Sequence, residues 1–324
     1  MTLETLVTTS KVQNGKIGGE IVVKAIQKFN LSSHITDFFV LGLATGSSPV
    51  TTYDYIVETA NSGEINIKEL VCFNLDEYIG LPGKNAEERK NHKESYWKFM
   101  NENLYSRLKV KPHASFIPKG FNFSTEDIDN ALKQSKEGVD YIKVGKENKG
   151  KAIFISQYTT CKDLIRIRKE MDDYSKLIES YGGIDLQVIG TGIEGHVGFH
   201  EAGIPFITNK EKNPIDAKFY TDVLLVELDS STREKACFDR HFSSLEESPK
   251  YAFSMGNDLV FNAEKILLLA NGEAKSRAIL EGLKLPVSQD IPLSKIQEHE
   301  DATAVIDYSA ANYLIRAPYN LKFI

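Results

Sequence analysis

Cysteine is scarce in this chain. Only Cys72, Cys161 and Cys237 occur in 324 residues, and they lie far apart in the sequence. A disulfide framework or a zinc-binding cysteine set needs more cysteines at short, regular spacings, so the sequence predicts neither. Such sparse cysteine use fits a reducing, cytoplasmic setting.

Long apolar runs are also missing. No run approaches the ~20 residues that a membrane-spanning helix needs. The first 15 residues lack the basic-then-apolar pattern of a secretory signal. We therefore expect a cytoplasmic protein with no membrane partner.

The chain also lacks a surplus of basic residues. Lysine and arginine number 39 against 45 aspartates and glutamates, which gives a formal net charge of −6 at pH 7. Binding to a phosphate backbone needs a basic face, so we expect no nucleic-acid partner. A local basic pocket for one small phosphate stays open.

The chain does have an alternation of apolar runs and helical patterns. Its length and its hydrophobic content of 41% provide for one large domain with an ample core. Strands alternating with helices predict an α/β fold: a Rossmann-like, mostly parallel sheet with helices on both faces. Strands are expected at residues 38–43, 70–73, 115–118, 152–155, 184–189, 219–228, 251–260, 265–270 and 304–306. Helices are expected at 47–59, 95–108, 126–144, 162–181, from 231 onward and at 275–283.

Residues 121–182 differ from the rest in being rich in Lys, Asp and Glu. A pair of solvated helices covering the sheet is the plain interpretation. A small lid or a partner surface is the sharper one. We expect a helical insertion at about residues 121–160 within a single domain that spans residues 1–324.

The first candidate site follows the strand at residues 38–43. There, Thr45, Gly46, Ser47, Ser48 and Pro49 lead into a helix. Glycine permits a tight turn, serine can cap the helix, and proline suits its first turn. The free N–H groups and hydroxyls of such a turn can bind an anion, typically phosphate. The same residue types also serve ordinary strand-to-helix turns, and no P-loop lysine follows.

A second candidate site lies where the strand at residues 70–73 ends. Asn74, Asp76 and Glu77 follow it directly. Acids at the carboxyl end of a strand are candidates for general-base catalysis. A carboxylate that only caps a turn is the alternative.

The third candidate site follows the apolar run at residues 184–189. Glu194, His196, His200 and Glu201 fall within eight positions, among several glycines. Histidines four residues apart can bind a metal from a helix, but the glycines disfavour a helix and the order His-Glu-x-x-His is absent. We therefore favour proton transfer over a metal site or a purely structural histidine.

Three cations lie near predicted strand-to-helix junctions: Arg233, Arg240 and Lys275. Each alone is more often a surface charge. Arg233 and Lys275 follow strands directly, on the rim where α/β proteins bind substrates.

Together these motifs resemble the glucosamine-6-phosphate deaminase (isomerase) family, whose relatives include the 6-phosphogluconolactonases. The likeness covers residues 36–315. Residues 45–49 are similar to the family's phosphate loop, and 74–78 (Asn-Leu-Asp-Glu-Tyr) to its Asn-Met-Asp-Glu-Tyr segment. Residues 192–201 (Gly-Ile-Glu-Gly-His-Val-Gly-Phe-His-Glu) resemble its Gly-x-Asp-Gly-His-Ile-Ala-Phe-Asn-Glu signature, and Thr232-Arg233 with Arg240-His241-Phe242 its arginine pair.

The resemblance implies a role for each matched residue. Asp76 would move a proton between C2 and C1 of the open-chain sugar. His196 would help to open the sugar ring, oriented by Glu201, with Glu194 completing the relay. The sugar phosphate would be held by Thr45, Gly46, Ser47, Ser48, Lys275 and Arg240, with Arg233 as the alternative arginine. No metal or organic cofactor is implied.

The chain departs from the family pattern at several positions. Glu194 stands where the family has Asp, and His200 replaces Asn. Two extra residues separate Arg233 from Arg240. Residues 204–218 do not match the basic–serine segment of the allosterically activated members, so we expect no such activation.

The expected activity is therefore deaminating isomerisation of glucosamine 6-phosphate to fructose 6-phosphate and ammonia. Three alternatives stay open: another hexosamine 6-phosphate, such as galactosamine 6-phosphate; a lactonase, disfavoured by Phe199-His200-Glu201; and a catalytically silent sugar-phosphate sensor. The roughly 37 residues before the first expected strand are too few for a DNA-binding domain. Assembly into a homo-oligomer is left open.

Overall fold

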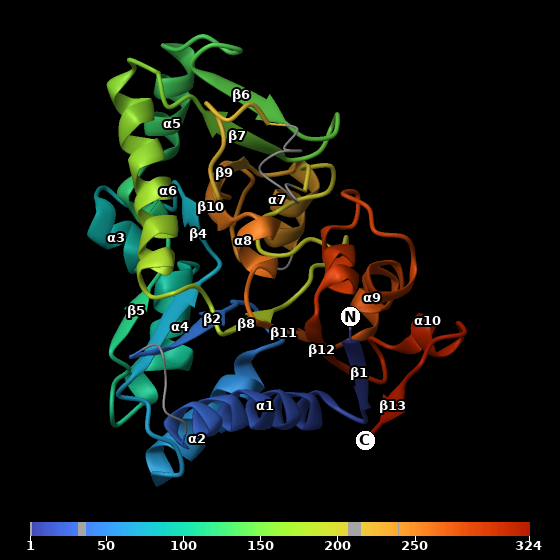
Figure 1. Cartoon of the computed structure of the whole chain (residues 1–324). Coiled ribbons are helices and arrows are strands. Elements are labelled where there is room, and N and C mark those ends of the chain that lie inside the picture. The colour runs from blue at the N-terminus through green and yellow to red at the C-terminus, as the bar shows by residue number, and fades with distance from the viewer. Residues whose placement is uncertain (1, 32–36, 207–214, 239) are drawn as a thin grey trace.

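A parallel sheet of eight strands forms the centre of the computed structural model, which describes residues 2–31, 37–206, 215–238 and 240–324 (Figure 1). Every strand pair in this sheet is parallel. The predicted Rossmann-like sheet is thus confirmed. In spatial order its strands are β13 (Lys322–Phe323), β1 (Thr2–Thr8), β12 (Asp301–Asp307), β11 (Lys265–Ala270), β8 (Leu186–Ile189), β2 (Phe39–Leu43), β3 (Leu70–Asn74) and β5 (Ala114–Phe116).

The central strands of this sheet are buried on both faces, because alternate side chains enter two different cores. On β2, Leu41 and Leu43 pack into one apolar cluster and Val40 into the other. Helices α1 (Lys11–Leu31), α2 (Val50–Ser62) and α4 (Tyr96–Asn103) supply the first cluster. Helices α6 (Lys162–Ser180), α9 (Ser276–Lys284) and α10 (Asn312–Ile315) supply the second. Continuous apolar strands are the expected consequence of such two-sided burial.

The strand order reverses between β2 and β8, which are neighbours although far apart in the chain. From β2 the chain moves outward through β3 to β5, and from β8 it moves the other way through β11 to β12. Loops on either side of such a reversal diverge and leave a crevice beyond the carboxyl ends of the strands, where α/β proteins bind ligands.

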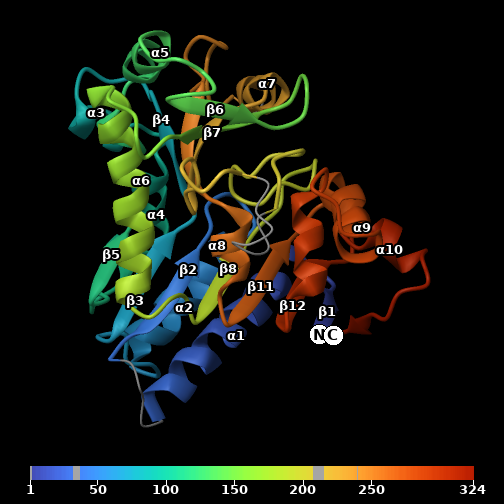
Figure 2. The same ribbon diagram turned by 45° about the horizontal axis from the view of Figure 1, so that its top comes forward.

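A second sheet of five strands, which the sequence analysis did not predict, lies above that crevice (Figures 1 and 2). All pairs of neighbouring strands in this sheet are antiparallel. In spatial order its strands are β4 (Asp76–Ile79), β10 (Tyr251–Met255), β9 (Val223–Glu227), β7 (Lys151–Ile155) and β6 (Tyr141–Val144). Because β4 starts two residues after β3 ends, the chain passes from one sheet to the other at Leu75.

The remaining elements are short, and two of them correct sequence predictions. These elements are α3 (Ala86–Lys90), α5 (Thr125–Lys133), α7 (Ser230–Phe238), α8 (Asn257–Phe261) and the 3₁₀ turns Tyr105–Arg107, Gly120–Asn122, Glu273–Lys275 and Pro292–Glu298. The helix expected at 126–144 ends at Lys133, and residues 141–155 form the β6–β7 hairpin. The strand expected at 251–260 stops at Met255, because Gly256 starts α8.

The N-terminal part of the chain was also misjudged. The first strand is β1, and residues 2–31 form β1 and α1, which belong to the parallel sheet and its cover. Residues 207–214, within the 204–218 stretch compared above, lie outside the described residues. Within the described ranges, no helix is long and apolar enough to cross a membrane.

Candidate active site

A cavity of about 490 Å³ opens at the point where the strand order reverses. It is lined by residues from all the predicted motifs and from several distant parts of the chain. The predicted residues on its wall are Thr45, Gly46, Ser47, Ser48, Asp76, Glu194, His196 and Lys275. The tertiary structure thus brings three separate sequence motifs and one cation to a single cavity.

The loop after β2 forms one wall. Gly46 has a φ of +97°, a conformation that glycine adopts without strain, and the chain turns there into α2. The Tyr53 hydroxyl donates a hydrogen bond to the Ala44 carbonyl and so ties α2 back to this loop. Contrary to our expectation, neither serine caps the helix: the N-cap is Pro49, which makes no side-chain hydrogen bond. The first N–H groups of α2 therefore lack a side-chain cap, as in an anion-binding turn.

Lys275 faces that loop from the 3₁₀ turn Glu273–Lys275, which follows β11. Its Nζ donates to Ser48 Oγ at 2.8 Å. Burial, with the nearby charge of Lys11, lowers the pKa of Lys275 to about 8. An anion bound beside this ammonium would offset both effects and keep it protonated.

Asp76 and Glu77 are adjacent in sequence, but their environments differ. Both are buried. Glu77 accepts four hydrogen bonds, from the Ser95 hydroxyl and from the N–H groups of Tyr78, Tyr96 and Trp97, so it anchors the start of α4. Burial nevertheless raises the pKa of Glu77 to about 7.

Asp76 lines the cavity, and its Oδ1 has no hydrogen-bond partner among the described residues. Burial, and then the charge of Glu77, raise the pKa of Asp76 well above its usual range. A buried carboxylate without donors is costly in a protein built only for stability. Such a group is a candidate for proton transfer to a bound molecule.

His196 lines the same cavity on the loop that follows β8. The Thr191 hydroxyl donates to the His196 carbonyl at 3.1 Å and holds this loop in shape. Burial lowers the pKa of the imidazole to about 4, although the charge of Glu194 opposes the shift. The ring is therefore neutral at pH 7 and can accept a proton.

The two glutamates expected around His196 have other partners. Glu194 lines the cavity and pairs with Lys149, with Oε2 and Nζ 3.1 Å apart. Glu201 is buried and accepts hydrogen bonds from the Asp229 N–H and the Thr232 hydroxyl, both at 3.1 Å. The structure thus holds Glu201 against the start of α7 and not against His196. Burial raises the pKa of Glu201 to about 7.

His200 is buried away from the cavity wall. Its Nδ1 accepts from the Asn257 N–H at 3.1 Å, which leaves Nε2 to donate to the Ile204 carbonyl at 3.1 Å. Two main-chain partners fix this ring as a neutral tautomer, and burial lowers its pKa to about 4. His200 therefore connects the loop after β8 to α8.

The two arginines are not brought to the cavity. The Arg233 guanidinium donates to the carbonyls of Leu245 and Ser248. Arg240 is exposed and has a φ of +65°. Among the described residues that line the cavity, Lys275 supplies the cationic side chain, because α7 directs Arg233 toward the segment that follows it.

Several residues on the wall were not predicted as site residues: Tyr96, Thr191, Phe199, Ser231 and Thr232. Tyr96 and Phe199 stack with their rings nearly parallel, 5.8 Å between centroids. All of them except Tyr96 lie within a quoted motif or beside one, which was the available signal. In the described ranges, no group of three or more His, Cys, Asp or Glu side chains could hold a metal ion.

Sequence comparison finds relatives over most of the chain, although no protein-family model matches it. The chain is 32% identical to the glucosamine-6-phosphate deaminase of Clostridium novyi (strain NT) over 275 residues, 85% of this chain and 88% of that protein. It is 30% identical to the glucosamine-6-phosphate deaminase of Thermoanaerobacter sp. (strain X514) over 312 residues, 96% and 95% of the two chains.

Solved structures agree with this likeness. A monomeric glucosamine-6-phosphate deaminase superposes with a TM-score of 0.65 and 25% identity, covering 95% of this chain and 99% of that one. The 6-phosphogluconolactonase of Thermotoga maritima shares the fold, with a TM-score of 0.55, 16% identity and coverage of 94% and 99%. The sequence identity and the coverage together place this chain in the glucosamine-6-phosphate deaminase family.

Proposed function

We propose that this protein is an enzyme that converts glucosamine 6-phosphate and water to fructose 6-phosphate and ammonia. The family of the chain and the contents of the cavity support this activity. The observation that carries it is Asp76, a buried carboxylate without a partner for Oδ1 on the wall of a cavity that also holds a lysine and a neutral histidine.

The phosphate of the sugar would bind between the loop after β2 and the end of β11. Thr45, Gly46, Ser47 and Ser48 offer N–H groups and hydroxyls there, and Lys275 offers its ammonium. Lys275 already contacts Ser48, so the two sides of this anion site are set before the ligand arrives. Fixing one end of the substrate in this way positions its reacting carbons.

Ring opening would use His196. A neutral imidazole can accept the proton of the anomeric hydroxyl while the bond from C1 to the ring oxygen breaks, and a proton then returns to that oxygen. Glu194 would support the imidazolium that forms, because the charge of its carboxylate already opposes the lowering of the His196 pKa by burial. Glu201 would act indirectly, because its hydrogen bonds hold the loop after β8 against the start of α7.

Isomerisation would use Asp76. Its carboxylate takes the proton from C2 of the open-chain sugar while O1 takes a proton from the ammonium at C2, which gives a neutral enolamine. The Asp76 carboxyl then returns its proton to C1, which leaves an iminium at C2. Water then adds to C2 and ammonia departs, leaving the ketone. A desolvated carboxylate is a stronger base than one in water, which suits removal of a carbon-bound proton.

The test follows ammonia release from a panel of hexosamine 6-phosphates, with and without a chelator. We expect release from glucosamine 6-phosphate without added metal. Preference for galactosamine 6-phosphate would change the substrate and keep the reaction type. If no member of the panel released ammonia while one of them bound tightly, the protein would be a sensor and not an enzyme.

We further propose that residues 1–324 act as one domain and that the protein works in the cytoplasm. Strands from both ends of the chain pair in the parallel sheet, which supports a single domain. An activity on a phosphorylated metabolite and three cysteines that are all unpaired support the location.

A further inference from the structure

The turn of the β6–β7 hairpin lies against the loop that carries Glu194 and His196. Gly150, in this turn, has no room for a side chain: an added Cβ would stand 1.9 Å from Glu201 Oε2. Gly203 likewise packs against Lys146 of the turn. The hairpin was part of the segment expected as an insertion, and its turn covers the loop after β8.

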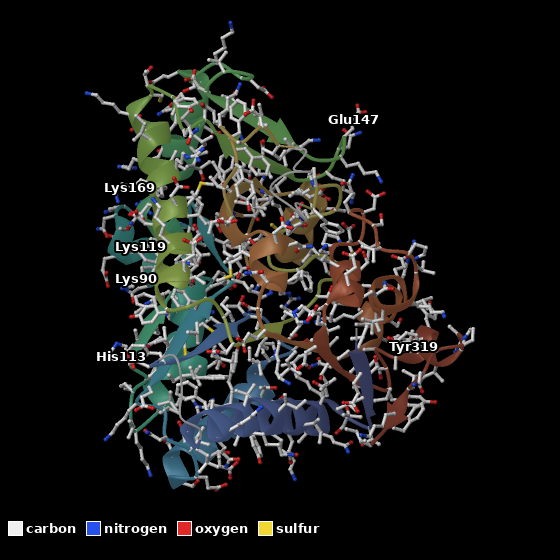
Figure 3. The ribbon with its side chains drawn as sticks, in the orientation of Figure 1. Lys90, His113, Lys119, Glu147, Lys169 and Tyr319 are labelled. Carbon is white, nitrogen blue, oxygen red and sulfur yellow. The ribbon has the colours of Figure 1, made fainter. Side chains whose placement is uncertain are left out.

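Lys149 is the residue of this turn that faces inward. It is half-buried, whereas Lys146 and Glu147 are exposed, and Figure 3 shows Glu147 pointing away from the molecule. Nζ of Lys149 lies 3.1 Å from Glu194 Oε2. The hydrogen bond to Glu194 raises the pKa of Lys149, with smaller contributions from the charges of Asp229 and Glu201.

Three acidic groups therefore act on Lys149: Glu194 and Glu201 from the loop after β8, and Asp229, which precedes α7. Of these, Glu194 lines the cavity together with His196 and Lys275. Without Lys149, the acidic groups would repel one another and the Glu194 carboxylate would lose the ion pair that holds it. Lys149 itself does not line the cavity, so it acts on the site through Glu194.

We propose that Lys149 is a positioning residue for the reaction at this cavity: it fixes the Glu194 carboxylate beside His196 and balances the charge of the acidic groups there. This inference rests on the proposed function. It assigns a function to the expected insertion at about residues 121–160, because the β6–β7 hairpin places a cation beside the loop that carries His196. It also fits the longer glutamate at position 194, which reaches outward to a partner on another element.

A matched pair of lysines in one turn provides the experiment. Lys146 pairs with Asp290 at 2.9 Å, and Lys146 does not line the cavity. Lys149→Met and Lys146→Met remove the same charge from the same hairpin. We expect Lys149→Met to lower kcat roughly tenfold, because the Glu194 carboxylate is no longer held in place. Inhibition by inorganic phosphate should stay within about twofold of wild type, because Glu194 is remote from the proposed phosphate site. Lys146→Met should stay near wild type, and Lys149→Arg should recover most of kcat.

A second measurement is independent of turnover. The His196 ring can be titrated by NMR, with His196→Gln identifying its signal. The charge of Glu194 is what opposes the lowering of the His196 pKa. Lys149→Met frees this carboxylate to move away from the ring, so it should lower the His196 pKa further and move the acid limb of the kcat/KM profile to lower pH. In a Glu194→Gln background the same change should have no further effect.

The possible results separate the proposal from its rivals. An unchanged His196 titration in Lys149→Met would overturn it, whether or not the protein releases ammonia. Equal losses in Lys149→Met and Lys146→Met would assign Lys149 only to docking of the hairpin. Weaker phosphate inhibition in proportion to the fall in kcat would make Lys149 a direct substrate contact. If the wild type released no ammonia, but Lys149→Met still shifted the His196 titration as expected, only the proposed function would be refuted.

Discussion

The two sheets of this protein contribute differently to the same cavity. The parallel sheet supplies an anion-binding side: the loop after β2, the uncapped start of α2, and Lys275 hydrogen-bonded to Ser48. Strand β4 of the antiparallel sheet supplies Asp76, a buried acid without a partner for Oδ1. One side is ready to hold a charge, and the other is ready to move a proton.

The difference teaches that polar groups on the two sides are satisfied to different degrees. Lys275 and Ser48 already bond to one another. Asp76 Oδ1 has no hydrogen-bond partner among the described residues, whereas the neighbouring Glu77 accepts four hydrogen bonds. A stable protein leaves few buried acids unsatisfied, so an unsatisfied acid on the cavity wall, as Asp76 is, marks the place where the ligand completes the site.

The largest expected effect comes from breaking the proton-transfer side. Asp76→Asn keeps the shape of the side chain but cannot accept a proton from C2. We expect kcat to fall by about 100-fold or more, with phosphosugar binding by calorimetry largely intact. If the variant kept more than about a tenth of wild-type turnover, Asp76 would not be the sole base.

Breaking the anion-binding side should affect affinity instead. Lys275→Met keeps the length of the chain and removes its charge, so we expect substrate affinity to weaken by roughly 10- to 100-fold, the value of one charge-assisted bond. Inhibition by inorganic phosphate at fixed salt is the measurement. Lys284→Met, at the exposed far end of α9, is the control, and an equal loss there would assign the effect to net charge.

The pair Asp76 and Glu77 can be separated by stability. Glu77→Gln replaces an acceptor oxygen by an amide that faces N–H donors, so we expect unfolding to become easier by about 1–3 kcal/mol. Denaturant unfolding measures this, and Asp76→Asn, at a carboxylate whose Oδ1 has no hydrogen-bond partner among the described residues, serves as the comparison. Similar losses in both variants would contradict the assignment of Glu77 to structure.

His200 should give a pH-dependent effect on stability. Its pKa is lowered to about 4, whereas an unfolded histidine titrates near 6.5. Between these values the unfolded state binds more protons, so this contribution to stability is complete above pH 6.5 and is lost as the pH falls toward 4. The stability advantage of wild type over His200→Gln should therefore shrink by on the order of 1–2 kcal/mol from pH 8 to pH 5. A constant difference across that range would exclude a neutral, buried His200.

The smallest effect is expected at Arg240. Its side chain is exposed and not on the cavity wall, so Arg240→Ala should change inhibition by inorganic phosphate by less than about twofold. A loss as large as that of Lys275→Met would show that the segment after α7 reaches the phosphate when substrate binds, as the family resemblance implies.

Much of the parallel sheet could be predicted from the sequence because its strands are buried on both faces and read as plain apolar runs. Strands β2, β3 and β11 were placed within one residue at each end. The antiparallel sheet was harder, since β6 has only one fully buried residue, Tyr141, and its sequence resembles a solvated helix. Strand β1 was missed although four of its seven residues are Thr or Val, which favour strands.

The sequence by itself determined which residue types could do chemistry: a glycine–serine turn after one strand, paired acids after the next, and an acid–histidine loop after a third. Those are local properties of the chain. Only the tertiary structure decided which of them act together, because hydrogen-bond partners come from distant elements. In the folded protein, Glu77 accepts hydrogen bonds from the start of α4, Glu201 accepts one from α7, and Glu194 pairs with Lys149. Asp76 instead faces the cavity. A carboxylate's role depends on the donors within hydrogen-bond distance of it, and those donors are set by packing.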